Sequence, residues 1–395
     1  MRAAVDRLSS AKSTPLYLDY WILGVSGALL ALGIVAIGSA SVNLADTRYE
    51  QPFYFAVRQA IYAAVGLLCA IAVMRMRLRF WRRMSSPLLV VGLALLVVVL
   101  IPGIGKTVNG STRWLTLGPV NMQVSEMVKL MIIVFYAALL SRYAVEIRDS
   151  WREMLRSLVP LALAAGLLLL EPDFGAMVVI VVTVGAMYFL AGLKLRYIGI
   201  LGVSAAAAFT VLMVASPYRF ERLMSFWHAC EPQYSYSQGY QLCQALIAFS
   251  RGEWFGVGLG SSVQKMYYLP EAHTDFLMAI LAEELGLFIT VIVIALYVVL
   301  ISRGLQIAQQ AHQQQNVFGA HLAVGIAVWF GLQAFINLGV NMGVLPTKGL
   351  TLPLLSYGGS SVIVSMTAIA MLLRVAHEVR DAAASGGGRT GWRGR

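Results

Sequence analysis

The chain has 395 residues, of which 59% are hydrophobic and 12% are charged, and its formal net charge is +11. A soluble globular domain carries about 25% charged residues, so this composition excludes an ordinary soluble enzyme. Apolar runs of about 20 residues, the length that crosses a bilayer core, recur along most of the sequence. Because these runs do not alternate apolar and polar residues as barrel strands do, they predict membrane-spanning helices.

Ten such runs follow one another along the chain. They cover approximately residues 20–42, 55–74, 86–104, 121–141, 155–170, 175–193, 197–216, 276–302, 316–340 and 359–376. The first run is longer than the apolar core of a signal peptide and is interpreted as an uncleaved span. The predicted fold is therefore an all-α integral membrane protein with a cytoplasmic N-terminal segment (1–19), one ten-span domain (20–376) and a disordered cytoplasmic tail (377–395).

Lysine and arginine residues are concentrated on one side of this predicted topology. They crowd the segments 74–83 and 141–156 and the tail from Arg374 onward, which are cytoplasmic if the N-terminus is cytoplasmic. Cytoplasmic loops of membrane proteins carry such an excess, and an even number of spans returns the C-terminus to the same side. The positive charge therefore predicts orientation and contact with anionic membrane lipids, and it does not indicate a nucleic-acid partner.

Ionisable residues in or at the edge of membrane spans are functional candidates by default, because burying a charge in a bilayer is costly. In chain order, the first candidates are Arg113 in "NGSTRWLTLG", Glu126 and Lys129 in "VSEMVKL", and Asp173 in "EPDFG". Glu126 and Lys129 are spaced i, i+3 and could simply neutralise each other on one helix face. Asp173 follows a proline near a helix start, where an aspartate also serves as an N-cap.

One connection is much longer than the others. Residues 217–275 join the seventh and eighth runs on the predicted extracytoplasmic side. Connections beyond about 15 residues in a compact protein are usually functional or disordered. Within this one, "GYQLCQALIAF" spaces its apolar residues as a short surface helix does. Cys230 and Cys243 also lie here, where oxidising conditions permit a disulfide, and they are a candidate pair.

Asp275 lies where this loop returns to the membrane, in "YYLPEAHTDF". A partly desolvated carboxylate at such a place can have a raised pKa and act as a general base. His273 precedes it by two residues, and either a substrate-binding or a purely structural role is open. Further on, Glu283 and Glu284 are adjacent, so at most one of them faces a given cavity and the other is expected to pair with a neighbouring span. Lys348 either binds an anionic ligand or extends to the interface.

Together these motifs resemble the SEDS family (shape, elongation, division and sporulation proteins), ten-span glycosyltransferases that polymerise peptidoglycan from lipid II. The resemblance covers about residues 15–380 and is most specific in "NGSTRWLTLG", "VSEMVKL", "EPDFG", "GVGLGSSVQKMYYLPEAHTDF", "EELG" and "NMGVLPTKGLTLPLLSYGGSS". It is stronger to the cell-division branch than to the elongation branch. There are two departures: Val124 stands where the family usually has proline, and the Asp-Pro often found before "GYQ" is missing.

The resemblance implies a role for each matching residue. The family's essential loop aspartate falls on Asp275, as the catalytic residue, and its polar cavity residues fall on Arg113, Glu126, Lys129, Asp173 and Lys348. The implied reaction has Asp275 remove the proton from an acceptor sugar hydroxyl, whose oxygen displaces undecaprenyl diphosphate from the donor with inversion. Cationic side chains, with or without a divalent cation such as Mg²⁺ or Mn²⁺, would stabilise the leaving group. No nucleotide or redox cofactor is implied.

The resemblance also implies partners and a location. The partners are lipid II, a class B penicillin-binding protein acting as septal transpeptidase, and other divisome proteins. The location is the division septum of the bacterial inner membrane. Three alternatives remain open at this point: a lipid II flippase, which could use the same cavity and charges, an elongation-type polymerase, and a non-catalytic scaffold for septal assembly.

Overall fold

A computed structural model describes residues 17–108, 111–117, 120–214, 221, 224–234, 237 and 239–386. Most of these residues are helical. The helices are α2 (Tyr20–Tyr49), α3 (Tyr54–Arg75), α4 (Leu78–Val99), α5 (Val124–Asp149), α6 (Trp151–Leu170), α7 (Phe174–Leu190), α8 (Leu195–Val214), α10 (Tyr240–Gly252), α11 (Leu277–Gln313), α12 (Val317–Asn341) and α13 (Gly359–Gly386). Each of the ten predicted apolar runs overlaps one of them, and the predicted short loop helix is α10.

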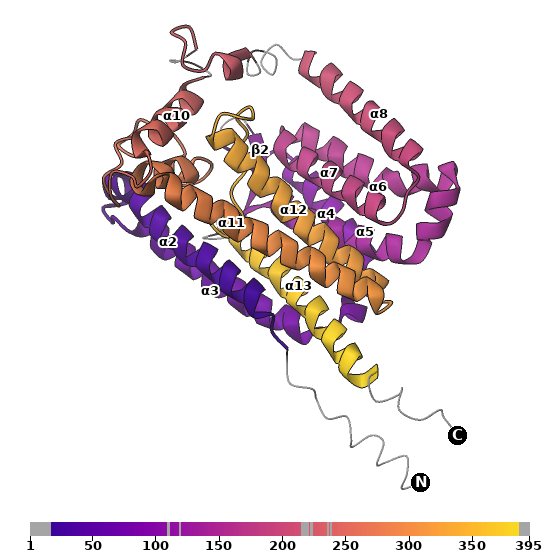
Figure 1. The fold of residues 1–395 in the computed structure, drawn as a ribbon. Helices are drawn as coiled ribbons and strands as arrows, with labels where there is room; N and C mark the ends of the chain where they lie inside the picture. Colours follow the sequence, from indigo (N-terminus) through magenta and orange to yellow (C-terminus); the bar gives the residue numbers. More distant parts are fainter. Residues whose placement is uncertain are drawn as a thin grey trace, which may run out of the picture.

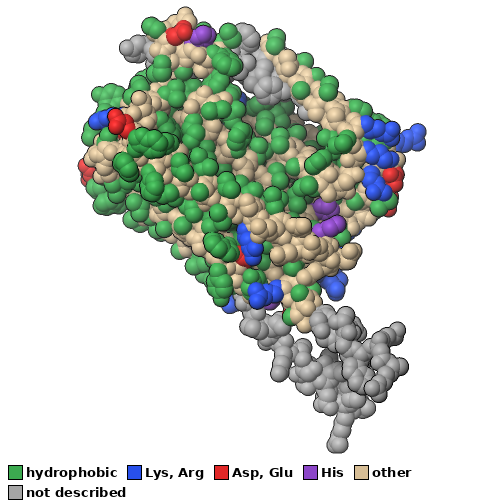
Figure 2. Space-filling model, in the orientation of Figure 1, with side chains coloured by type: hydrophobic (Ala, Val, Ile, Leu, Met, Phe, Trp, Pro, Cys, Tyr) green, Lys and Arg blue, Asp and Glu red, His purple; other side chains and the backbone are tan. Residues whose placement is uncertain are grey.

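Within the described residues, eight helices are long and apolar enough to cross a membrane, and α7 and part of α8 are shorter apolar helices. A mostly helical, multi-pass membrane fold is therefore confirmed. The hydrophobic surface fits this environment. In Figure 2, hydrophobic side chains cover the middle of the visible face, and Lys and Arg side chains gather at its right-hand edge and lower end.

Three helices form the centre of the bundle. In the apolar segments of α5, α12 and α13, 72%, 72% and 78% of the residues are buried, against 28–33% in the other long helices. Helix α12 packs on α11, α5 and α7, and α13 packs on α3 (Figure 1). These three helices therefore form the interior of the bundle, whereas the other long helices turn most of their apolar side chains outward, where lipid can surround them.

A small sheet precedes α5, which the all-α prediction missed. Strands β1 (Gly105–Val108), β2 (Ser111–Leu117) and β3 (Val120–Gln123) form an antiparallel sheet in the order β1-β2-β3. Trp114 pairs with Lys106 on one side and with Gln123 on the other. Strands of four to seven residues leave little periodic signal in a sequence, so the sequence predicts a loop here and assigns residues 121–123 to the apolar run that follows. The sheet leads directly into α5.

The two ends of the described chain meet. The Tyr17 backbone N–H donates to His377 Nδ1 at 3.1 Å, so the start of α2 lies beside the end of α13. Helix α13 continues to Gly386, ten residues into the segment predicted to be a disordered tail. The rest of that tail (387–395) and most of the predicted N-terminal segment (1–16) lie outside the described residues.

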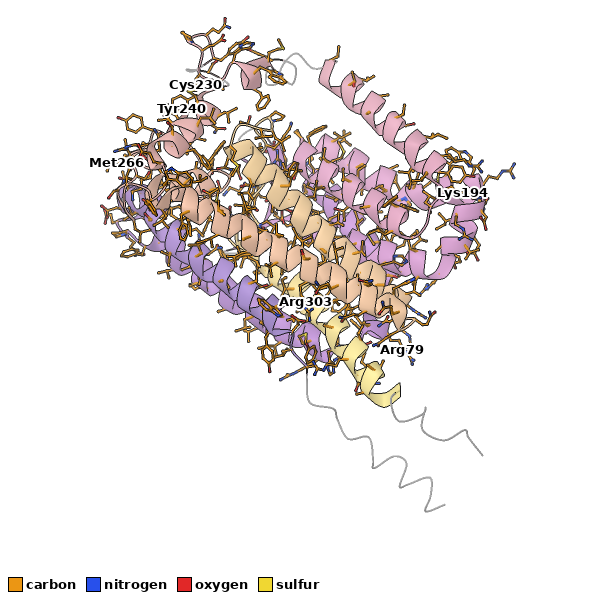
Figure 3. The ribbon with its side chains drawn as sticks, viewed as in Figure 1. Arg79, Lys194, Cys230, Tyr240, Met266 and Arg303 are labelled. Carbon is orange, nitrogen blue, oxygen red and sulfur yellow. A yellow bond between two sulfur atoms is a disulfide. The ribbon has the colours of Figure 1, made fainter. Side chains whose placement is uncertain are left out.

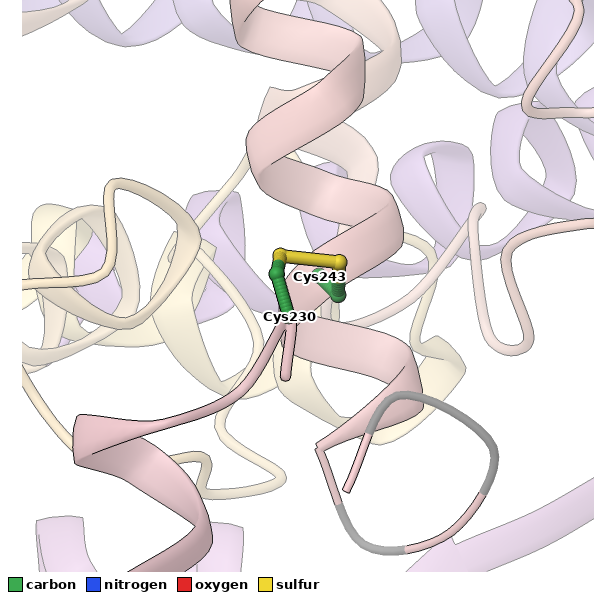
Figure 4. The surroundings of a disulfide bond; sticks show 2 residues. All are labelled: Cys230 and Cys243. Carbon is green, nitrogen blue, oxygen red and sulfur yellow. A yellow bond between two sulfur atoms is a disulfide. The ribbon is translucent and has the colours of Figure 1, made fainter. Parts of the chain in front are cut away.

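A disulfide bond links two parts of the long loop. Cys230 and Cys243, the candidate disulfide pair, are bonded, with their Cα atoms 5.0 Å apart (Figure 4). The bond joins the segment 224–234 to α10, whose buried face includes Leu242 and Ala245. The third cysteine, Cys69, is free and half-buried in α3.

Breaking the disulfide is expected to loosen the segment 224–234. Residues 230 and 243 are separated by 13 positions, and closing a loop of this size stabilises by about 3 kcal/mol. Cys230→Ser should therefore increase amide hydrogen exchange and proteolytic cleavage in this segment, with little change in the spans. Cys69→Ser is the matched control, because it removes a thiol that is not in the bond. Equal protection before and after reduction would contradict the prediction.

Candidate functional site

Asp275 lies just before the N-terminus of α11, and its backbone is fixed by two asparagines of α12. Asn337 and Asn341 each donate from Nδ2 to the Asp275 carbonyl oxygen at 2.9 Å. The Asn341 side-chain oxygen also accepts from the Ala279 N–H at 3.1 Å, in the first turn of α11. A Cβ at Gly349 would lie 3.0 Å from Asp275 Oδ2, so the loop after α12 passes close to the carboxyl group. The side chain itself is half-buried.

Arg113 and Asp173 form a second part of the site. Asp173 caps α7 by accepting from the Ala176 N–H at 3.2 Å, as the N-cap interpretation predicts, and also accepts from the Ser125 hydroxyl at 2.8 Å. Arg113 Nη1 lies 3.7 Å from Asp173 Oδ1, and Nη2 donates to the Pro172 carbonyl at 2.9 Å. The sheet thus places an arginine against the turn between α6 and α7.

The electrostatics of Asp275 connect these two parts. Burial raises the pKa of Asp275 to about 7; the negative charges of Glu271 and Asp173 also raise it, and Arg113 lowers it. A carboxyl group with this pKa exchanges its proton near neutral pH, as a general base must. Asp275, Arg113 and Asp173 therefore act on one another within one site.

Lys348 and His273 lie beside this site in different ways. The Lys348 ammonium lies 4.5 Å from the centre of the Phe174 ring, and Phe174 is the residue that follows Asp173 in the chain. The His273 ring packs between Phe55 and Tyr357, with ring centres 4.6 and 5.5 Å away. Burial lowers the pKa of His273, so the ring is held neutral. This geometry favours the structural reading of His273, whereas Lys348 brings a second cation to the turn that carries Asp173.

Glu126 and Lys129 lie deeper, inside the bundle. Lys129 Nζ donates to Glu126 Oε1 at 2.8 Å and to the Gln333 side-chain oxygen at 2.7 Å. The two charged side chains are only 4% and 1% exposed. Gln333 in turn donates to the Thr351 carbonyl at 2.8 Å. The i, i+3 ion pair, which is the alternative to substrate binding, is therefore present. Through Gln333 it connects α5 to α12 and to the loop segment that contains Thr351.

Glu171 also lies beside the site, although it is not among the site residues that the sequence predicts. Its side chain is fully buried, and neither carboxyl oxygen has a hydrogen-bond partner among the described residues. Burial raises its pKa to about 8; the nearby Asp173 also raises it, and Arg113 lowers it. The signal in the sequence was the acid pair of "EPDFG", where two carboxylates so close together cannot both be ionised cheaply.

Replacing Glu171 by glutamine is expected to stabilise the fold more near pH 8 than near pH 5. In the folded state burial holds the pKa of Glu171 at about 8, whereas the ordinary pKa of a glutamate is 4.5. Between these two pKa values the folded state binds more protons than the unfolded state. Its stability therefore falls as pH rises, by at most about 1.4 kcal/mol per pH unit. Glutamine removes that loss. Melting temperatures in detergent at both pH values test this, with the exposed Glu253→Gln as control; a glutamine variant that is no better near pH 8 contradicts it.

Comparisons with known proteins show the family to which the chain belongs. The family described as cell cycle protein, which covers FtsW, RodA and SpoVE, matches residues 20–381. A probable peptidoglycan glycosyltransferase FtsW of Legionella pneumophila is 51% identical over 369 residues, covering 93% of each chain. The protein of the same name in Nitrosococcus halophilus is 53% identical over 365 residues, covering 92% of this chain and 93% of its own.

Two solved structures are similar to the whole fold. One belongs to work on structural coordination of polymerization and crosslinking by a peptidoglycan synthase complex; its TM-score is 0.75 at 28% identity, covering 92% of this chain and 99% of that one. The other is the rod shape determining protein RodA of Thermus thermophilus, with a TM-score of 0.67 at 27% identity, covering 92% and 98%. The chain therefore belongs to the family of FtsW, RodA and SpoVE cell cycle proteins, and the resemblance to SEDS proteins is confirmed.

Proposed function

We propose that this protein is a peptidoglycan glycosyltransferase that polymerises lipid II into β-1,4-linked glycan strands at the division septum. Relatives that are about half identical over more than nine tenths of both chains are named probable peptidoglycan glycosyltransferase FtsW, which supports the proposal. The single observation that carries the proposal is the half-buried Asp275, whose pKa is raised to about 7 and which is influenced by Arg113. A general base beside a cation suits the attack of a hydroxyl on a donor whose leaving group is anionic.

In the proposed reaction, the Asp275 carboxylate takes the proton from the sugar 4-hydroxyl of the acceptor. The hydroxyl oxygen bonds to the anomeric carbon of the donor as the bond from that carbon to the diphosphate oxygen breaks. Undecaprenyl diphosphate leaves with that bonding pair, and inversion at carbon gives the β-1,4 link. Arg113 and Lys348 offset the negative charge that develops on the leaving diphosphate, and Asp275 then releases its proton to water.

The divalent cation implied by the resemblance finds no ready set of protein ligands. Asp173 is already paired with Arg113 and Ser125. No cluster of three or more His, Cys, Asp or Glu residues suited to a metal ion occurs within the described part of the chain. The residues present therefore do not fit a protein-held metal centre, and the mechanism has no step that passes through one.

The proposed topology has ten spans in one membrane domain (20–376), cytoplasmic termini and the loop 217–275 outside the cytoplasm. The positions of basic residues and of the long loop support it. Arg79, Lys194 and Arg303 lie toward one end of the bundle, and the loop residues Cys230 and Met266 lie toward the other (Figure 3). The site would then face the outer side of the inner membrane, where lipid II sugars are available. The Glu126–Lys129 pair and His273 would support the substrate-binding loops from beneath.

The proposed partner is a class B penicillin-binding protein, acting with other divisome proteins. The similar solved structure concerns a synthase complex that coordinates polymerization with crosslinking, which supports such a pairing. A chain with one catalytic centre for polymerisation needs a second protein to crosslink the strands it makes. Anionic membrane lipids would contact the cytoplasmic arginines and lysines.

Purified lipid II tests the proposal directly. The full-length protein, co-purified with its transpeptidase partner, should convert lipid II into glycan strands, detected by gel electrophoresis and by digestion with a muramidase. A flippase would instead move labelled lipid II across vesicles and make no strands, and that result would overturn the proposal. Septal against lateral-wall localisation of a tagged copy separates the division role from the elongation role.

A further inference from the structure

Helix α11 consists of two helices that meet at Gly286. This residue has φ 74° and ψ −170°, far from helical values, and it interrupts the helix two turns after its start. Residues 277–284 are buried without exception, whereas Leu287, Phe288 and Val291 beyond the break are exposed at 40%, 61% and 55%. We call residues 277–285 the buried half-helix. Asp275 lies two residues before it, at the edge of the bundle interior, whereas the longer half of α11 turns one face toward lipid.

The break is filled by backbone from the long loop. A broken helix leaves N–H and C=O groups without their usual partners, which is costly at membrane depth. Here two N–H groups after the break donate to loop carbonyls, and two loop N–H groups donate to carbonyls before it. The four bonds are Leu287 to Glu253 at 2.8 Å, Phe288 to Trp254 at 3.2 Å, Val257 to Glu283 at 3.0 Å and Gly258 to Glu284 at 2.9 Å.

The approach of the loop is close enough to require glycine. A Cβ at Gly256 would lie 2.1 Å from the Glu284 carbonyl oxygen, and one at Gly286 would lie 2.4 Å from the Trp254 backbone. Both glycines also have positive φ, at 79° and 74°. The insertion of the loop into the break thus explains why both positions are glycine.

The Glu284 side chain ties the end of the buried half-helix to the loop and to α2. Lys265 Nζ donates to Glu284 Oε1 at 2.8 Å, and the Ser39 hydroxyl donates to Oε2 at 2.6 Å. The side chains of Lys265 and Glu284 are 3% and 1% exposed. A buried ion pair of this kind is strongly destabilised when one partner is removed, because the remaining charge is left in a poor solvent.

The Glu283 side chain makes a second set of contacts with the same loop. Arg251 Nη1 donates to Glu283 Oε1 at 2.9 Å, and the Val263 N–H donates to the same oxygen at 3.1 Å. The Ser262 hydroxyl and the Gln264 N–H donate to Oε2. The sequence predicts that one of the two adjacent glutamates pairs with a neighbouring span, and Glu284 does so through Ser39 of α2. In addition, both glutamates bind the loop, because the break at Gly286 lets the loop reach both faces of the last turn.

We propose that Glu283 and Glu284 are positioning residues for Asp275. With Arg251, Ser262 and Lys265 they form a clamp on one end of the buried half-helix, while Asn337 and Asn341 hold the other end. The clamp fixes the half-helix as a rigid body and thereby fixes how deeply the Asp275 carboxyl lies in the protein. This inference rests on the proposed function, since it assigns the clamp a role in the polymerisation reaction.

The clamp acts on Asp275 through position and not through charge. The charged groups that face Asp275 are Glu271 from the loop, Arg113 from β2 and Asp173 from the turn before α7. Lys348, over the Phe174 ring, lies near the same turn. No clamp residue is among the charges that shift Asp275. A change in the clamp that alters the titration of Asp275 must therefore move the half-helix or admit water beside the carboxyl group.

The test is the pH dependence of lipid II polymerisation by the full-length protein in complex with its transpeptidase partner. Wild type should gain activity with a midpoint near pH 7, the value at which Asp275 titrates. In Glu284→Gln, looser packing hydrates Asp275, and the midpoint should fall by about one pH unit. The turnover number should fall about ten- to a hundredfold with the KM for lipid II little changed, as expected for a misplaced catalytic group. Glu253→Gln, the same substitution on an exposed side chain of the same loop, should keep the wild-type profile.

A purely structural role predicts something else. If Glu284→Gln only reduces the amount of folded protein, the amplitude falls and the midpoint stays at the wild-type pH, which overturns the proposal. If this variant does not fold, Arg251→Gln carries the test, because its side chain is 43% exposed and Glu283 keeps three other donors. A smaller downward shift supports the clamp, and an unchanged midpoint in that variant overturns it. Failure of wild type to polymerise would instead overturn the proposed function, and polymerisation that does not need Asp275 would overturn the role of Asp275 as the general base.

Discussion

Asp275→Asn is expected to lower the rate of lipid II polymerisation about a thousandfold while leaving the protein folded. A general base contributes about 10² to 10⁴ in rate, and asparagine cannot accept the proton. The fold should survive because Asn337 and Asn341 bind the backbone carbonyl of residue 275, not its side chain. Asparagine also has nearly the same size as aspartate, which matters because Gly349 lies against the carboxyl group.

The measurement is the initial rate of strand synthesis together with the melting temperature of each purified complex. Asp46→Asn is the matched control, since it makes the same chemical change at an exposed position of α2. An Asp275→Asn variant that polymerises at the wild-type rate would remove Asp275 from the mechanism. An unfolded variant would show that the side chain has a structural role that the present contacts do not include.

The pH profile of the wild-type enzyme should follow the same carboxyl group. Because the pKa of Asp275 is raised to about 7, the active carboxylate form is lost as pH falls through 7, well above the ordinary aspartate value of about 3.9. Glu271→Gln removes a negative charge that raises this pKa, so the midpoint should move to lower pH. Activity measured across a pH series checks this. A midpoint that stays in place or moves upward in Glu271→Gln contradicts it.

The sequence was most informative where one physical requirement acts along a continuous segment. Bilayer crossing demands about 20 apolar residues, so every predicted run overlaps a helix. The helix ends were less predictable: α13 extends ten residues beyond its apolar run. Val124, which replaces the usual proline of the family, still begins α5, because β3 leads straight into that helix.

Features that depend on contacts distant in the chain were harder to predict. Gly286 looks like an ordinary glycine within an apolar helix, and only the arrival of residues 253–258 reveals a break. The adjacency of Glu283 and Glu284 predicts different surroundings, and Glu284 does bind Ser39 of α2, but the loop that enters the break and binds both side chains was not predictable. Asp275 was found through its motif, and its two asparagine partners lie more than sixty residues away. Such partners leave no periodic signal.

The second large effect concerns stability. Lys129→Met is expected to lower the free energy of unfolding by about 3–5 kcal/mol, because it leaves the Glu126 carboxylate buried without its cation. Lys129 donates to one carboxyl oxygen of Glu126, and the other oxygen, Oε2, already lacks a hydrogen-bond partner among the described residues. Lys129 also donates to Gln333, so the variant loosens the link between α5 and α12. The double variant Glu126→Gln/Lys129→Met removes both charges and should recover most of the loss.

Unfolding in detergent, followed by loss of helical signal, measures these differences. Lys194→Met is the control, because Lys194 is 41% exposed in its pair with Asp149 and such pairs contribute about 1 kcal/mol or less. A Lys129→Met variant as stable as wild type, or a double variant no better than the single one, would contradict the prediction. The double variant also separates the two roles of the pair. If it folds and polymerises lipid II normally, Glu126 and Lys129 only hold α5 against α12; if it folds with a raised KM, they also contribute to substrate binding.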